Sequence, residues 1–307
     1  MKYFTLENIT NEAIHLPILK KTGITLSIKR EDKIHEFISG NKYRKLKYNL
    51  QEASTQKHTA LLSFGGAYSN HIAAVAQAGE LFGFKTIGII RGEELANKVS
   101  ENTTLTFARS KGMKLVFISR EQYRRKNEKA FLESLNNTYG RFYTIPEGGT
   151  NELAVKGCEE ILDEQDKQFD YIACCVGTGG TIAGLINASA TKQQVLGFPA
   201  LKGDFLINDI RKFARKNNWT LIHDYSFGGY AKVNRQLIAF LNEFYDTTGI
   251  QLDPVYTGKM MFGILDLIKN SYFKKGSKIL AIHTGGLQGI AGMNQKLKRK
   301  NLPLISL

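Results

Sequence analysis

The sequence predicts an α/β protein in which parallel strands alternate with helices. Apolar, β-branched runs recur along the 307 residues, each ending in glycine or a polar turn, with longer segments of helical periodicity between them. Such alternation is typical of parallel sheets covered by helices on both faces. The runs are 60–64, 86–90, 115–118, 142–145, 171–176, 195–198 and 279–282, and the clearest helical segments are 69–81, 152–164 and 233–245.

Length and composition indicate a folded, cytoplasmic protein. Hydrophobic residues make up 42% and charged residues 23% of the chain, which is ordinary for a globular protein. The length suits one large or two modest domains. No segment approaches the roughly 20 apolar residues of a membrane helix, and residues 1–17 lack the pattern of a signal peptide. We therefore expect no membrane partner.

The formal net charge of +14 raises nucleic-acid binding as a hypothesis. The positive residues are spread along the whole chain, however, and the densest run, 296–300, is most simply a solvated helix face. We expect no nucleic-acid partner. A positive field would instead attract an anionic cofactor and the carboxylate of an amino acid.

The three cysteines, Cys158, Cys174 and Cys175, predict neither a disulfide framework nor a metal site. Their number is odd, two are adjacent within an apolar run, and no Cys or His pair has ligand spacing. We expect buried, unreactive thiols and no bound metal.

Three predicted strands run into glycine-rich turns, where ligands collect in folds of this class. Gly65-Gly66 leads to Ser69-Asn70, residues 177–181 follow the strand at 171–176, and His283-Thr284 precedes a glycine pair. A glycine-rich turn that opens a helix can bind an anion through free N–H groups, or it can be a plain tight turn. The sequence lacks the Walker lysine, and the dinucleotide fingerprint fits poorly.

Lys42 and Lys45 form a second candidate site. If a helix begins near Asn41, these lysines are neighbours on one helix face. A second cation lowers the pKa of a lysine amine and so favours its reaction with an aldehyde, and Lys45 could also pair with a phosphate. A solvated basic helix start is the alternative.

Five motifs together resemble the pyridoxal 5′-phosphate (PLP) enzymes of the 1-aminocyclopropane-1-carboxylate (ACC) deaminase and D-cysteine desulfhydrase family. This family belongs to the tryptophan synthase β-like, or fold type II, PLP enzymes. The motifs occur in family order between about residues 29 and 290. They are Lys-Arg-Glu-Asp (29–32) with Ser-Gly-Asn-Lys-Tyr-Arg-Lys-Leu (39–46), Gly-Gly-Ala-Tyr-Ser-Asn-His (65–71), the loop 176–181, Asp-Pro-Val-Tyr-Thr-Gly-Lys (253–259) and His-Thr-Gly-Gly (283–286).

The resemblance implies a role for individual residues. Lys42 would carry the cofactor as a Schiff base, and Asn70 would hydrogen-bond its 3′-oxygen. Ser69 would meet the substrate carboxylate or assist proton transfer, and Tyr256 and Tyr230 would be the active-site tyrosines. Lys42 would be the default proton acceptor, assisted by Ser69 and Tyr256. The phosphate cradle would consist of Lys45, Gly177, Thr178, Gly179, Gly180 and Thr181.

The chain departs from the family pattern at several positions. Tyr68 stands where Gln is common, Ala73-Ala74 replace polar residues, and the surroundings of Tyr230 differ from the usual ones. These departures affect the substrate more than the cofactor. We assign no catalytic role to His71, and His283 is read as structural.

The resemblance also implies the architecture. We expect a two-lobed enzyme with the cofactor in the interlobe cleft, a smaller inserted lobe at 45–149, and a larger lobe formed by 1–44 and 150–307. Gly148-Gly149-Thr150 is the candidate crossing between the lobes. The family further implies a homodimer.

The expected reaction is β-elimination of a small amino acid, with D-cysteine as the first choice. The deaminases of the resembling family carry an acidic residue after the Asp-Pro-Val-Tyr tyrosine and a leucine in the His-x-Gly-Gly motif. This chain has Thr257 and Thr284 there, as is typical of the desulfhydrases. Hydroxyls near the pyridine nitrogen would suffice when thiolate leaves. Alternatively, Thr257 merely caps the following helix, and Tyr68 and other unmatched positions decide the substrate. The other functions left open are an ACC deaminase, an enzyme for another amino acid, and a PLP-binding protein without turnover.

Overall fold

The computed structural model describes residues 6, 9–201, 203 and 205–307, and it confirms the α/β class. Its strands form a six-stranded sheet in the order β1-β2-β10-β7-β8-β9 and a four-stranded sheet in the order β5-β4-β3-β6. The strands are β1 (Asn11–Ala13), β2 (Thr25–Lys29), β3 (Ala60–Gly65), β4 (Lys85–Arg91), β5 (Lys114–Ile118), β6 (Tyr143–Ile145), β7 (Tyr171–Val176), β8 (Gln194–Pro199), β9 (Trp219–Leu221) and β10 (Lys278–Ile282).

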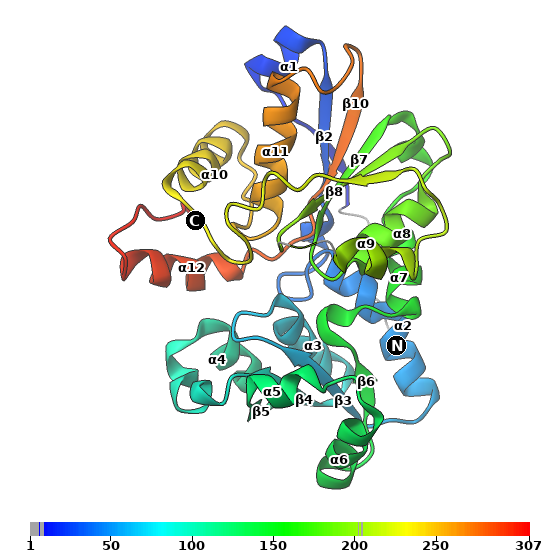
Figure 1. Ribbon diagram of the computed structural model, residues 1–307, viewed down its shortest axis with the longest axis vertical. Helices are drawn as coiled ribbons and strands as arrows, with labels where there is room; N and C mark the ends of the chain where they lie inside the picture. Colours follow the sequence, from blue (N-terminus) through cyan, green and yellow to red (C-terminus); the bar gives the residue numbers. More distant parts are fainter. Residues whose placement is uncertain (1–5, 7–8, 202, 204) are drawn as a thin grey trace.

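Helices surround both sheets, and the two sheets occupy opposite ends of the molecule in Figure 1. All strand pairs are parallel except the edge pair β1–β2. The helices are α1 (Pro17–Thr22), α2 (Asn41–Thr55), α3 (Asn70–Phe82), α4 (Thr103–Ser110), α5 (Arg120–Arg124), α6 (Lys129–Tyr139), α7 (Glu152–Glu159), α8 (Gly180–Ala188), α9 (Phe205–Arg211), α10 (Arg235–Thr248), α11 (Thr257–Lys269) and α12 (Gly289–Lys298), with 3₁₀ segments η1 (Glu31–Ile34), η2 (Glu93–Glu101), η3 (Glu147–Gly149) and η4 (Glu164–Gln168).

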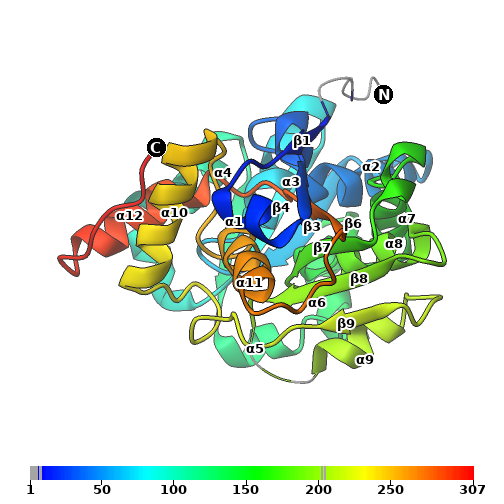
Figure 2. The same ribbon diagram turned by 90° about the horizontal axis from the view of Figure 1, so that it is seen from above.

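The four-stranded sheet is formed by residues 60–145, and the six-stranded sheet takes its strands from both sides of that segment. The view from above shows helices covering the six-stranded sheet, with α11 against it on one side and α8 on the other (Figure 2). The chain passes from the smaller to the larger sheet through η3, at the glycine pair predicted as a crossing. Gly148 and Gly149 both have positive φ there, +65° and +68°.

Helix α2 joins the two parts of the molecule, and the expected boundary between residues 44 and 45 falls inside it. One of its faces packs in the core of the smaller sheet, while the other lies against α7, as Figure 1 also shows. A Cβ at Gly157 of α7 would lie 1.9 Å from the Arg44 carbonyl oxygen, so only glycine permits this approach. Arg44 also donates two hydrogen bonds, of 2.8 and 2.7 Å, to buried Glu31. The start of α2 is therefore rigidly held.

The predicted helix over 152–164 ends early, at Glu159. The acidic residues that follow bind elsewhere instead of extending it. Asp163 caps η4 and, together with Asp166, contacts the buried ammonium of Lys29 at 2.8 and 2.6 Å. No helix of the described residues is long and apolar enough to cross a bilayer.

Candidate active site

A cavity of about 1000 Å³ lies where the carboxyl ends of strands from both sheets meet. Its walls include the turns that follow β3, β4, β7 and β10, together with the start of α2. The glycine-rich strand ends that the sequence singled out are thus brought together, as expected for a ligand site in a parallel α/β fold.

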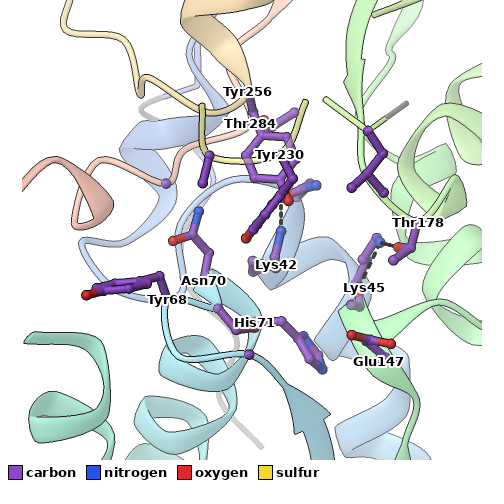
Figure 3. A pocket seen from close by; sticks show the side chains of 18 of the residues that line it. Lys42, Lys45, Tyr68, Asn70, His71, Glu147, Thr178, Tyr230, Tyr256 and Thr284 are labelled. Carbon is purple, nitrogen blue, oxygen red and sulfur yellow. Dashed lines mark hydrogen bonds between the residues drawn. The ribbon is translucent and has the colours of Figure 1, made fainter. Parts of the chain in front are cut away.

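Lys42 projects into this cavity from the first turn of α2, as Figure 3 shows. The helix begins at Asn41, as predicted, after Gly40, whose φ is +56°. A Cβ at Gly40 would lie 2.3 Å from the Thr284 carbonyl oxygen, so glycine is required here. The Lys42 ammonium donates to Asn41 Oδ1 at 3.0 Å, and burial lowers the pKa of Lys42. A lowered pKa favours the neutral, nucleophilic amine.

Lys45 lies one turn further along α2, on the same cavity wall. Its Nζ donates to the Gly148 carbonyl at 2.9 Å and contacts the Thr150 and Thr178 hydroxyls at 3.1 and 3.4 Å. Burial, helped by the charge of Lys42, lowers the pKa of Lys45 to about 8. This cation thus faces hydroxyls and a carbonyl and lacks a paired carboxylate within the described residues.

The loop from Gly177 to Thr181 enters α8 beside Lys45. Gly179 has a φ of +84°, and among the described residues no side chain caps the first turn of α8. A Cβ at Gly180 would lie 2.8 Å from Thr150 Oγ1 and 3.3 Å from Lys45 Nζ. Free N–H groups at a helix start, close backbone approach and an adjacent ammonium are the features that bind a phosphate. The residues present therefore fit the phosphate of PLP.

The turn after β3 carries Tyr68, Ser69 and Asn70, which all line the cavity. Figure 3 shows Tyr68 and Asn70 on the side of Lys42 that is opposite to Lys45. Ser69 caps α3, because its Oγ accepts from the Ile72 N–H at 3.3 Å. Asn70 Oδ1 accepts from Gln288 Nε2 at 3.2 Å, which fixes the orientation of the amide. All three side chains line the cavity and can reach a small ligand.

Two tyrosines, Tyr230 and Tyr256, form the remaining wall (Figure 3). Their rings make an edge contact with centroids 6.1 Å apart. Burial raises the pKa of both phenols, for Tyr256 well above its usual value. Both are therefore neutral near pH 7 and can donate a proton or a hydrogen bond.

Lys259 of α11 anchors the loop that carries Tyr230, a function that the sequence analysis did not assign to it. The side chain is 2% exposed, and its ammonium donates to the carbonyl oxygens of Ser226 and Gly229, both at 2.8 Å. Phe227 and Ala231 in this loop have φ near +50°, an unfavourable conformation for these residue types. The buried ammonium compensates for this strain. In the sequence, the only sign of this function is that Lys259 ends the motif 253–259.

The structure does not bring Thr257 to the cavity. This residue is fully buried, and its hydroxyl donates to Asp253 Oδ1 and accepts from the Asp253 N–H, both at 2.9 Å. Asp253 also accepts backbone N–H bonds from Val255, Tyr256 and Thr257. Thr257 is the first residue of α11, whose N-cap residue is Tyr256, so its hydroxyl closes the turn before the helix through Asp253 and does not cap the helix. Thr284 does line the cavity, and its Oγ1 lies 3.0 Å from Cys175 Sγ.

The remaining expectations concern side chains that the structure places in the interior. All three cysteines are free and buried. His283 is fully buried and bonds the Gln251 carbonyl at 2.7 Å. His71 lies against the cavity with its Nε2 at 2.8 Å from Ser63 Oγ, and burial holds its pKa well below the usual value. In the described part of the chain, no group of three His, Cys, Asp or Glu side chains could hold a metal ion.

Comparison with known proteins identifies the family. Residues 6–285 match the model of the pyridoxal-phosphate dependent enzyme family. The chain belongs to this family. A putative ACC deaminase of Thermotoga maritima is 32% identical over 91% of this chain and 94% of its own length. A bifunctional D-cysteine desulfhydrase/ACC deaminase of Arabidopsis thaliana is 32% identical over 87% of this chain and 74% of its own length.

A solved structure described as an ACC deaminase homologue has the same fold, with a TM-score of 0.78 and 28% identity over 97% of this chain and 96% of that one. The chain is thus a PLP-dependent enzyme of the ACC deaminase and D-cysteine desulfhydrase type, with the fold type II architecture. The fit of residues 177–181 and Lys45 to a phosphate agrees with this cofactor.

Proposed function

We propose that this enzyme converts D-cysteine by β-elimination into pyruvate, ammonia and sulfide. The proposal rests on the part of the cavity wall between β7 and β10, which we call the neutral wall because it presents uncharged side chains. There the Thr284 hydroxyl lies 3.0 Å from the Cys175 thiol. The nearby carboxylate of Asp253 is occupied by Thr257 and backbone amides. The acidic residues that line the cavity, Glu94, Glu147 and Asp209, lie on other walls.

A neutral wall suits an elimination in which the leaving group is good. PLP supplies stabilisation of negative charge at the substrate α-carbon. A carboxylate beside the pyridine nitrogen strengthens this effect, whereas a hydroxyl leaves it weaker. A thiolate at the β-carbon departs readily under these conditions, while opening a cyclopropane has no such leaving group.

We assign the protein side of the reaction to five residues. Lys42 carries the cofactor and, when freed by the substrate amine, accepts the α-proton at Nζ. Ser69 binds the substrate carboxylate, and Asn70 binds the cofactor 3′-oxygen. The neutral phenols of Tyr230 and Tyr256 supply a proton to the departing sulfur.

A separate set of residues holds the phosphate of the cofactor. They are Lys45, Thr178, Thr181 and the backbone of Gly177, Gly179 and Gly180.

The position of Thr257 weakens one part of the sequence argument, because only Thr284 of the two threonines reaches the cavity. The names of the relatives favour ACC deamination as the second candidate. The smaller lobe at 45–149, the larger lobe at 1–44 and 150–307, the homodimer and the cytoplasmic location stay predictions from the sequence.

Steady-state kinetics decide between the two reactions. We expect kcat/KM for sulfide release from D-cysteine to exceed kcat/KM for 2-oxobutyrate release from ACC, with both activities lost in Lys42→Ala. A clear preference for ACC, or no sulfide from D-cysteine, would contradict the proposal. Lys57→Met is the matched control, since Lys57 is exposed beyond the end of α2 and outside the cavity.

A further inference from the structure

One end of the cavity is lined by positive side chains that the reaction above does not use. They come from the end of β4 and from α5 with the turn after it, and they are Arg91, Arg120, Arg124 and Lys126. The acidic residues at this end are already paired. Arg120 contacts Glu94 at 2.5 Å, and Lys126 contacts Glu147 at 3.3 Å. The guanidinium groups of Arg91 and Arg124 have no carboxylate partner among the described residues.

Arg91 is exposed, packs on the ring of Tyr123 and has no hydrogen-bonding partner among the described residues. It is the last residue of β4, and its guanidinium carbon lies 5.5 Å from the centroid of the Tyr123 ring, which is 2% exposed. In the described part of the chain, neither Arg91 nor Arg124 forms a hydrogen bond or an ion pair. A guanidinium resting on a buried aromatic face keeps its N–H donors free for a ligand.

Arg91 also lies close to the turn that is assigned to the substrate carboxylate. Its Nη2 is 3.6 Å from the point that a Cβ on Gly66 would occupy, and Gly66 begins the turn that carries Ser69 and Asn70. The charge of Arg91 reaches Tyr230, where it opposes the larger upward effect of burial on the phenol pKa. Arg91 thus faces the same space as the turn and the tyrosine.

The negative charges of the cofactor and of a simple amino acid are bound elsewhere in the cavity, so they do not pair with the arginines at this end. The phosphate is assigned to Lys45 and residues 177–181, and the substrate carboxylate to Ser69. The cavity of about 1000 Å³ has to hold the cofactor as well as the substrate, and this volume is at the upper end of the range for small-molecule sites. A carboxylate pairs with a guanidinium through two parallel hydrogen bonds.

We propose that Arg91, assisted by Arg124, forms an anion subsite for a second acidic group on the substrate side chain. The preferred substrates are amino acids whose β-substituent ends in a carboxylate. This inference rests on the proposed amino-acid site, and it adds a specificity that D-cysteine itself does not use. D-cysteine would then be turned over because thiolate is a good leaving group, while the better ligands are longer and acidic.

Two probes of nearly equal shape test the subsite, S-carboxymethyl-cysteine and its neutral amide S-carbamoylmethyl-cysteine, each as both enantiomers. Binding to the holoenzyme is followed by the absorbance change of the bound cofactor, which requires no turnover. We expect the acid to bind at least about 10-fold more tightly than the amide, as a charge-assisted pair predicts. Arg91→Met should remove most of this preference, and Arg124→Met part of it.

Arg125→Met is the control, because Arg125 is adjacent in sequence, pairs with Glu128 at 2.9 Å and does not line the cavity. It should keep the full preference for the acid. Equal affinity for the two probes, no binding of the acid, or an unchanged preference in Arg91→Met would overturn the subsite. A preference that depends on Arg91 in an enzyme that releases no sulfide from D-cysteine would support the subsite and refute the proposed reaction.

Discussion

Replacing Lys45 with methionine removes a buried cation whose pKa is shifted, and the effect should be visible in the stability of the cofactor-free protein. The pKa of Lys45 is lowered from 10.5 to about 8, because burial and the charge of Lys42 disfavour the ammonium. Between these two values the unfolded chain binds more protons than the folded chain. Stability must therefore rise as the pH rises through this window.

The size of this rise follows from the two pKa values. Integrated from about pH 7.5 to about pH 9.5, one lysine with these values contributes about 2 kcal/mol to the free energy of unfolding. Lys42 and Lys259 also have lowered pKa values and remain in both proteins, so their own contributions largely cancel. Because Lys42 and Lys45 repel each other, the difference between the two proteins includes the change that Lys45→Met causes at Lys42. Lys45→Met should reduce the pH-dependent rise by about 2 kcal/mol.

Urea unfolding of the cofactor-free protein at the two pH values measures this quantity. Lys57→Met, at an exposed lysine beyond the end of α2, should retain the rise of the unmodified protein. A Lys45→Met variant whose pH dependence matches the unmodified protein within about 0.5 kcal/mol would show that Lys45 does not titrate in this window. The same substitution should weaken PLP binding on the order of 100-fold, because it removes the ammonium that faces the phosphate.

Three further substitutions test other parts of the site. Gly179→Val should lower PLP occupancy after gel filtration while circular dichroism stays unchanged, because the φ of Gly179 is +84° and a Cβ would lie 3.0 Å from Ile210; full occupancy would count against the loop. Lys259→Met should accelerate hydrogen exchange in residues 226–231 and lower kcat, an effect absent if this lysine does not anchor the Tyr230 loop. Thr257→Val should cost about 2 kcal/mol of stability in urea unfolding, because it leaves Asp253 without its hydroxyl donor, yet it should not change the ratio of kcat/KM for D-cysteine to that for ACC. A changed ratio would show that Thr257 influences the substrate.

The sequence predicted the elements whose pattern is strong and local. The seven expected strands are all present, from β3 to β8 and at β10, because buried parallel strands are continuous apolar runs. The helix starts at Asn41 and near Ser69 were also predicted. Strands β1, β2 and β9 were missed. β1 and β9 are three-residue edge strands, and β2 ends at Lys29, which is buried only through its distant partners Asp163 and Asp166.

The candidate site was predictable to the level of motifs but not of side-chain direction. Lys42, Ser69, Asn70, Tyr230, Tyr256 and Thr284 line one cavity, although they are far apart in sequence. Thr257 follows Tyr256 directly, yet its hydroxyl turns to Asp253, because the turn before α11 requires a partner for that carboxylate. Arg91 and Lys259 were missed because their significance depends on contacts with Tyr123 and with the Tyr230 loop.

We propose that the site is built around the Lys42 amine, and the lysine to which the cofactor is covalently attached can be identified by experiment. Borohydride reduction of the holoenzyme, followed by proteolysis and fragment mass spectrometry, locates the lysine that bears the cofactor. We expect a yellow protein in which the added mass lies on Lys42 and is absent from Lys42→Ala. Cofactor found on Lys45, Lys47 or any other lysine would contradict it.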